Sequence, residues 1–130
     1  MAENIAQFRF NSYKILSSSI KVEDTDQLNP NIQVEFSGKN TIDHGNFKFR
    51  LELTSKIFND NKSIDIEVVA VGFFEFDRNL SDELKNIFFQ SNAPAILFPY
   101  VRAYIGTLTA LSGISPVVLP TLNLSNNSEA

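Results

Sequence analysis

The stretch 92-NAPAILFPYVRAYIGTLTALSG-113 is the most informative part of the sequence, because it predicts one long apolar helix near the end of the chain. Its large apolar residues recur at helical spacing and predict one apolar face: Leu97, Val101, Ile105 and Leu108. Small residues gather on another side, where a second helix could pack closely: Ala103, Gly106, Thr107 and Ala110. Gly113 and then Pro116 predict where the helix stops.

A helix that is apolar over most of its circumference has to be covered on several sides. A chain of 130 residues has little to cover it with, so we expect a second copy of the chain to take part. The expected helix contact uses Tyr104 together with the small residues Ala103, Gly106, Thr107 and Ala110. Arg102 is expected to form an ion pair or a stacked contact at this subunit interface, or otherwise to bind a ligand.

Four segments with strand patterns precede the helix: residues 7–22, 32–37, 47–54 and 63–76. The first changes phase near Asn11, which predicts a β-bulge. Residues 38–46 are expected to be a loop holding the only histidine, His44. The segment FNDNK is expected to be a hairpin turn.

The fourth strand pattern is apolar on both faces. Ile66, Val68, Ala70 and Phe74 can pack under the helix, whereas Val69, Val71 and Phe73 lie on the other face with Glu67. An uncovered apolar stripe predicts a surface for binding apolar partners. The segment PVVLPTLNL either covers this stripe or forms one wall of a groove, so the predicted binding residues are Val69, Val71, Phe73, Val118 and Leu119.

After Asp77 the pattern changes from strand to helix. Ser81 is the expected N-cap of a short helix, Asn92 is the expected cap of the long one, and Pro99 is expected to kink or restart it. The predicted fold class is α+β: a four-stranded antiparallel sheet followed by a short helix and a long apolar helix packed on one face. Residues 1–130 are expected to form a single domain, with 125–130 disordered.

Composition narrows the class of function. The chain has 11 basic and 15 acidic residues, which argues against nucleic-acid binding. Its beginning lacks the pattern of a signal peptide, and no apolar run is long enough for membrane insertion, so a cytoplasmic location is expected. Twelve phenylalanines either fill the core or line a surface for apolar partners.

The sequence offers no arrangement of catalytic or metal-binding residues. With no cysteine and one histidine, a metal would need carboxylates, and the cluster at Glu23, Asp24 and Asp26 lacks the spacing of a calcium loop. The serines at 17–19 have no nucleophile-elbow glycines around them. We therefore predict no enzyme activity, no metal and no cofactor; a hotdog-like thioesterase is an alternative, but it would place its central helix earlier in the chain.

The region from Asn92 to Leu124 resembles the last third of SecB-like protein-export chaperones. The resemblance rests on Leu97-Phe98-Pro99-Tyr100 followed by Arg102, and on the run Pro120, Leu122, Asn123, Leu124. Upstream only the pattern matches: four strands and a GFF step at 72–74.

This resemblance implies a four-stranded antiparallel sheet backed by helices, assembled as a homotetramer that is a dimer of dimers. It also implies an ATP-independent holdase that binds unfolded polypeptide clients through apolar grooves. It implies a short form of the family that lacks the second C-terminal helix. A contact with the SecA motor would use Glu67 and, by a looser match, Glu23. An alternative is a SecB-like chaperone dedicated to one client, such as an antitoxin.

Overall fold

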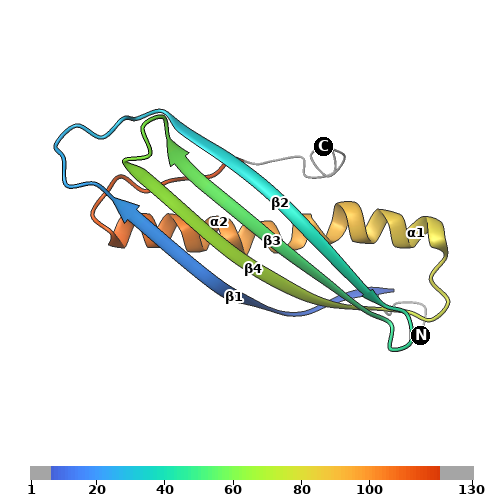
Figure 1. The fold of residues 1–130 in the computed structure, drawn as a ribbon. Coiled ribbons are helices and arrows are strands. Elements are labelled where there is room, and N and C mark those ends of the chain that lie inside the picture. The colour runs from blue at the N-terminus through green and yellow to red at the C-terminus, as the bar shows by residue number, and fades with distance from the viewer. Residues whose placement is uncertain (1–6, 121–130) are drawn as a thin grey trace.

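One antiparallel sheet carries one long helical arm on a single face. The computed structural model, which describes residues 7–120, contains β1 (Phe8–Val22), β2 (Ile32–Asp43), β3 (Lys48–Asn59) and β4 (Ile64–Phe76). The strand order is β1-β4-β3-β2. The helical arm consists of α1 (Asp82–Ile87), a π-helical segment η2 (Phe88–Asn92) and α2 (Ala93–Leu111), and Figure 1 shows it running behind the sheet. The predicted fold class is confirmed; residues 125–130 lie outside the described part of the chain.

The edge strand β1 contains two bulges. Its pairing with β4 shifts between Phe10 and Ser12, where the sequence predicted a bulge, and again between Ile15 and Ser17. A bulge adds one residue to the strand and so changes which side of the sheet the following side chains face. After the first bulge, Tyr13 and Ile15 face the same side as Phe10. The second bulge was not predicted, because the serines that follow it carry no apolar alternation.

The other edge strand, β2, is longer than predicted. Residues 38–43 are strand rather than loop, because each pairs in unbroken register with β3 as far as Asp43 opposite Lys48. The polar residues between Gly38 and Asp43 suggested a loop, and the pairing overrides that local preference. The turn that follows is closed by Asp43, whose carboxylate accepts hydrogen bonds from the backbone N–H groups of Gly45 (3.1 Å) and Asn46 (3.2 Å).

Phenylalanine rings fill the core between the sheet and the helical arm. Phe49 of β3 stacks on Phe89 of η2 with ring centroids 4.2 Å apart, and both rings are buried. Phe8 of β1 stacks on Phe74 and Phe88. The aromatic cluster therefore ties three strands to the start of the helical arm, and the residues predicted to lie under the helix are buried there: Ile66, Val68, Ala70 and Phe74.

Gly72 leaves room for the ring of Phe74 in the core between the sheet and α2. A Cβ atom on Gly72 would lie 2.9 Å from Cε1 of Phe74 and 3.5 Å from Cδ1 of Leu97 on the helix. Distances below about 3 Å are not tolerated without movement, so the glycine provides the space that the Phe74 ring occupies, whereas the distance to Leu97 is that of an ordinary van der Waals contact.

The helical arm is continuous, which corrects two expectations. Ser81 caps α1 as predicted, since its Oγ accepts a hydrogen bond from the Leu84 N–H (3.2 Å). Asn92, in contrast, has helical φ and ψ angles and no side-chain capping bond. The helix α2 continues through Pro99, so the expected restart is wrong, while a kink at Pro99 stays a prediction. A π-helical segment precedes Pro94, which lacks the N–H that an α-helical bond to Gln90 would need. The wider turn therefore costs little at this point.

The segment after α2 folds back along the helix. The buried Thr109 holds it: its Oγ1 accepts a hydrogen bond from the Val117 N–H (2.8 Å) and donates to the Ile105 carbonyl (2.8 Å). Leu119 is fully buried in the core cluster. Residues 114–120 thus lie on the helix side of the sheet, and they do not cover the opposite face.

Candidate functional site

A groove of about 470 Å³ lies beside the start of β2, on the helix side of the sheet. One wall is the loop at Leu28–Pro30 with the β2 residues Ile32 and Val34, and Ile64 also lines it. The other wall is the segment 114–120. None of the described residues that line the groove carries an ionisable side chain. The groove therefore suits uncharged, mostly apolar side chains.

A buried asparagine holds the loop wall in place. Asn59, at the end of β3, is fully buried and donates from Nδ2 to the Asn29 carbonyl (3.1 Å) and to Ser63 Oγ (2.7 Å). Its Oδ1 accepts a hydrogen bond from the Ile64 N–H (3.0 Å). Since buried amides keep their partners, the loop wall has a fixed position relative to the β3–β4 hairpin.

The second wall alternates between anchored and exposed residues. Leu119 is buried, whereas its neighbour Val118 is 67% exposed and faces the groove. Pro116 and Pro120 bracket this pair and restrict its backbone. The wall thus presents Val118 as an apolar contact without needing a partner to order it.

The predicted binding stripe on β4 lies on the opposite face of the sheet. Val71 is fully buried there, and Val69 and Phe73 are half-buried. Long polar side chains flank them: the Lys14 ammonium lies 5.9 Å from the Phe73 ring centroid, and Glu52 pairs with Val71 across the strands. The structure therefore separates Val69, Val71 and Phe73 from Val118 and Leu119, and only the last two line the groove.

Opposite charges alternate across this outer face. Lys48 pairs with Glu75, and its hydrogen bond and charge hold the pKa of the Glu75 carboxyl below the ordinary value. Glu67, predicted for a SecA contact, lies 3.8 Å from the Lys56 ammonium. Glu23 is exposed beyond the end of β1. These pairings reduce the negative potential that a basic partner would meet.

The face of α2 that points away from the sheet carries small residues. Ala103, Thr107 and Ala110 are exposed there. Gly106 instead faces the chain's own C-terminal segment, since a Cβ atom on it would lie 3.8 Å from the Val117 carbonyl oxygen. The Tyr104 hydroxyl is 2.8 Å from Ser18 Oγ of β1.

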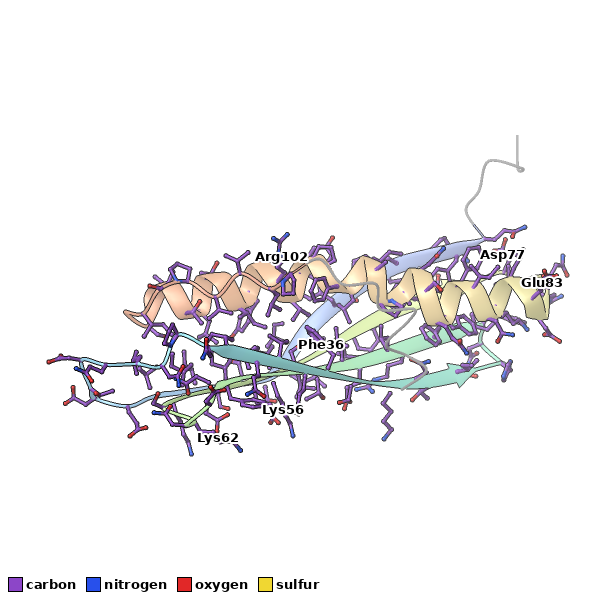
Figure 2. All side chains as sticks on the ribbon, turned by 90° about the horizontal axis from the view of Figure 1, so that it is seen from above. Phe36, Lys56, Lys62, Asp77, Glu83 and Arg102 are labelled. Atoms are coloured by element: carbon purple, nitrogen blue, oxygen red, sulfur yellow. The ribbon has the colours of Figure 1, made fainter. Side chains whose placement is uncertain are left out.

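Arg102 is exposed, and Figure 2 shows it on the helix side, away from Lys56 and with Phe36 between the two layers. The helical face that could meet a second subunit therefore consists of the exposed residues, and Gly106 and Tyr104 already have contacts within the subunit.

The described residues contain no group of three or more histidine, cysteine, aspartate or glutamate side chains that could hold a metal ion. Within residues 7–120, no helix is long and apolar enough to cross a membrane. What the groove offers chemically is mostly apolar surface, with the uncharged polar residues Asn29 and Ser115 in its lining.

Sequence reasoning missed most of the groove. Leu28, Ile32 and Val34 line it, yet none of the three is among the predicted binding residues. Pro116 and Pro120 enclose the apolar run 117–119 on one wall, whereas asparagines flank Pro30 on the other. The proximity of the two walls depends on the return of the chain after α2, which no local pattern predicts.

Comparison with known proteins identifies relatives across most of the chain. The family model described as "Preprotein translocase subunit SecB" matches residues 12–126. An uncharacterized protein of Methanocaldococcus jannaschii, MJ0357, is 34% identical over 113 residues, which are 85% of this chain and 72% of that protein. The protein-export protein SecB of Aromatoleum aromaticum is 31% identical over 81% of this chain and 67% of its own length. SecB of Orientia tsutsugamushi is 25% identical over 95% of this chain and 76% of its own.

Among solved structures, the Mycobacterium tuberculosis SecB-like chaperone Rv1957, in complex with a ChAD peptide from the Rv1956 HigA1 antitoxin, has the same fold. The TM-score is 0.74, with 16% identity, covering 89% of this chain and 88% of that one. A protein of unknown function from Streptococcus agalactiae is similar at a TM-score of 0.51, with 13% identity over 88% of this chain and 97% of that one.

Proposed function

Because the chain belongs to the SecB family, we propose that it is an ATP-independent holdase that binds unfolded polypeptides in the groove between the 28–30 loop and residues 114–120. The observation that carries the proposal is the chemistry of that groove. It is open, mostly apolar and free of ionisable side chains among its described lining residues. An unfolded chain exposes the apolar side chains that such a surface binds.

The groove is preformed, which supports binding without an energy source. Asn59 holds one wall and Thr109 holds the other, both through hydrogen bonds of their buried side chains. A preformed site needs little ordering when a client binds, so less of the interaction energy is lost. Client binding and release can then depend on the client concentration, without ATP hydrolysis.

A chaperone dedicated to one client is the second candidate. It is favoured by the likeness to Rv1957, whose structure holds an antitoxin peptide. A general chaperone is the stronger proposal, because the groove has no charged side chain with which to select one sequence.

The proposal includes assembly into a homotetramer, a dimer of dimers, through the exposed small residues of α2, and a cytoplasmic location. We expect no contact with SecA, since Glu67 is close to Lys56 and positive and negative side chains alternate on the outer face. We also expect no enzyme activity.

Replacing Val118 with aspartate is expected to weaken client binding roughly 10-fold, since the variant loses the burial of an apolar side chain and adds a charge to the groove. Val118 is 67% exposed in the subunit, so the substitution should leave the fold intact. Suppression of the aggregation of a chemically unfolded protein, measured by light scattering without nucleotide, gives the readout.

The matched control is Leu111→Asp, which places the same charge on an apolar side chain that is 83% exposed and does not line the groove. Phe73→Ser with Val69→Ser tests the outer stripe separately. If the Leu111→Asp control lost as much client binding as Val118→Asp, or if only the stripe variant lost it, the client would bind outside the groove.

A further inference from the structure

A second hollow, of about 400 Å³, lies at the end of the sheet near the β2–β3 turn and is called the outer hollow below. One row of cross-strand neighbours lines it: Ser12 on β1, Phe73 on β4, Arg50 on β3 and Thr41 on β2. None of the described residues that line it also lines the groove. We propose that the outer hollow binds an aromatic carboxylate, which is either a small aromatic acid or the carboxyl-terminal residue of a polypeptide that ends in an aromatic residue.

The outer hollow opens on the face of the sheet opposite the helical arm. Arg50 and Lys56 are both even-numbered residues of β3, so their side chains leave the strand on the same face. Figure 2 shows Lys56 on the side of the sheet away from the arm. The buried rings of Phe49 and Phe74 also border the hollow, so its floor is apolar.

The first bulge of β1 brings two neighbouring side chains to the outer hollow. In a regular strand successive side chains alternate between the two faces, so only one of two neighbours reaches a given face. The register shifts between Phe10 and Ser12, and both Asn11 and Ser12 line the hollow. Bulges are frequent next to active sites, where they redirect a side chain. An amide and a hydroxyl group therefore lie beside Phe73, the cross-strand neighbour of Ser12.

Arg50 has N–H groups for a further acceptor. Within residues 7–120 the one hydrogen bond of its guanidinium runs from Nη1 to Glu52 Oε1 (3.2 Å), and its side chain is 36% exposed. A guanidinium carries several N–H donors in a planar fork that matches a carboxylate. The bond to Glu52 therefore leaves donors free, and the hydroxyl of Thr41, opposite Arg50 on β2, adds another.

The other acidic side chains around the outer hollow are already bound. Glu75 is paired with Lys48, and both carboxylate oxygens of Asp43 accept hydrogen bonds within the β2–β3 turn. Lys14, in contrast, has no ion-pair partner among the described residues, and its ammonium lies 5.9 Å from the Phe73 ring centroid. The unpaired charge beside the ring is therefore positive, which favours an anionic ligand.

The Phe73 ring and the Arg50 guanidinium together define the ligand. Phe73 is half-buried, so part of its ring is available for stacking on a second aromatic ring. Neighbouring strands lie about 4.8 Å apart. A carboxylate joined to a ring by a short linker therefore reaches Arg50 while its ring contacts Phe73. The volume of about 400 Å³ accommodates a group of the size of one amino acid.

A titration followed by backbone amide chemical shifts tests this site. The probe is N-acetylphenylalanine, which carries both the ring and the carboxylate. We expect a Kd of about 1 mM or below and shifts at Ser12, Arg50 and Phe73. N-acetylphenylalaninamide has the ring without the charge, and acetate has the charge without the ring, so both should bind at least about 10-fold more weakly. Equal binding of the acid and the amide, or shifts confined to the groove, would overturn the inference.

Arg50→Gln and Lys56→Gln form a matched pair of variants. Both lie on the same face of β3, but only Arg50 lines the outer hollow. We expect the affinity for N-acetylphenylalanine to fall about 10-fold in Arg50→Gln and less than about 2-fold in Lys56→Gln. Arg50→Lys keeps the charge without the planar fork and should also weaken binding, which gives a second test if Arg50→Gln does not fold. Unchanged affinity in a folded Arg50 variant contradicts the proposed site.

Two peptides that end in phenylalanine distinguish the sources of the ligand, one with a free carboxyl end and one with an amidated end. If the free-acid peptide binds as well as N-acetylphenylalanine and the amidated peptide does not, the ligand is the end of a polypeptide. If neither peptide binds but N-acetylphenylalanine does, the ligand is a small aromatic acid. Equal binding of both peptides at the outer hollow overturns the inference. The Val118→Asp assay tests the groove independently, so failure of the outer hollow leaves the proposed function standing.

Discussion

Replacing Phe49 with alanine is expected to lower the free energy of unfolding by about 3–5 kcal/mol, the range for removing a buried phenylalanine ring. Phe49 is buried and stacks on Phe89 at 4.2 Å, and it also contacts the rings of Phe8 and Phe74. The cavity would open where strands β1, β3 and β4 meet the helical arm. Urea unfolding followed by circular dichroism measures the change.

Phe58→Ala is the matched control, because Phe58 lies on the same strand but on the outer face and is half-buried beside Lys62. Phe58→Ala should lower the free energy of unfolding by less than about 1.5 kcal/mol. If both variants lost a similar amount of unfolding free energy, the two faces of β3 would be equally packed. That result would contradict a core that lies on one face of the sheet only.

Replacing Ala103 and Ala110 together with glutamate is expected to dissociate the proposed tetramer while each subunit stays folded. Both side chains are exposed on the face of α2 that points away from the sheet, so the substitutions remove no contact within the subunit. Glutamate also favours helix formation. At a close helix contact, however, the larger charged side chains would repel and separate the helices. Multi-angle light scattering should show a mass below that of four subunits.

The control is Ala103→Ser with Ala110→Ser, which keeps both side chains small and uncharged. This variant should keep the mass of the unmodified protein. A glutamate variant that remains a tetramer would show that this face of α2 is not the interface, and a subunit that is monomeric before any substitution would end the proposal for assembly.

The sequence predicts those parts of the fold that depend on local periodicity. The alternation through Phe49, Leu51 and Leu53 places β3 correctly because one face is buried and the other is wet. The spacing of Leu97, Val101 and Ile105 likewise predicts the buried face of α2. Ser81 is identified because its side chain and the acidic first turn act within a few residues.

The remaining features depend on contacts between distant segments. Residues 38–43 are strand because β3 pairs with them, and their own composition resembles a loop. Asn92 does not cap α2 because the π-helical segment makes the helix continuous around Pro94. The groove forms only when residues 114–120 return along α2 and meet the loop near Leu28. Five residues were predicted for binding, and the structure brings only Val118 and Leu119 to this site; the role of Val69, Val71 and Phe73 stays a prediction.

Site-specific photo-crosslinking distinguishes a client bound in the groove from a client bound on the outer face of the sheet. A photoreactive amino acid is placed at Val118, in the groove, or at Thr54, which pairs with Val69 on the outer face. The assembled protein is then irradiated with a chemically unfolded client and without nucleotide. We expect strong crosslinks from position 118 and few from position 54. Crosslinks concentrated at position 54, with none at 118, would contradict binding in the groove.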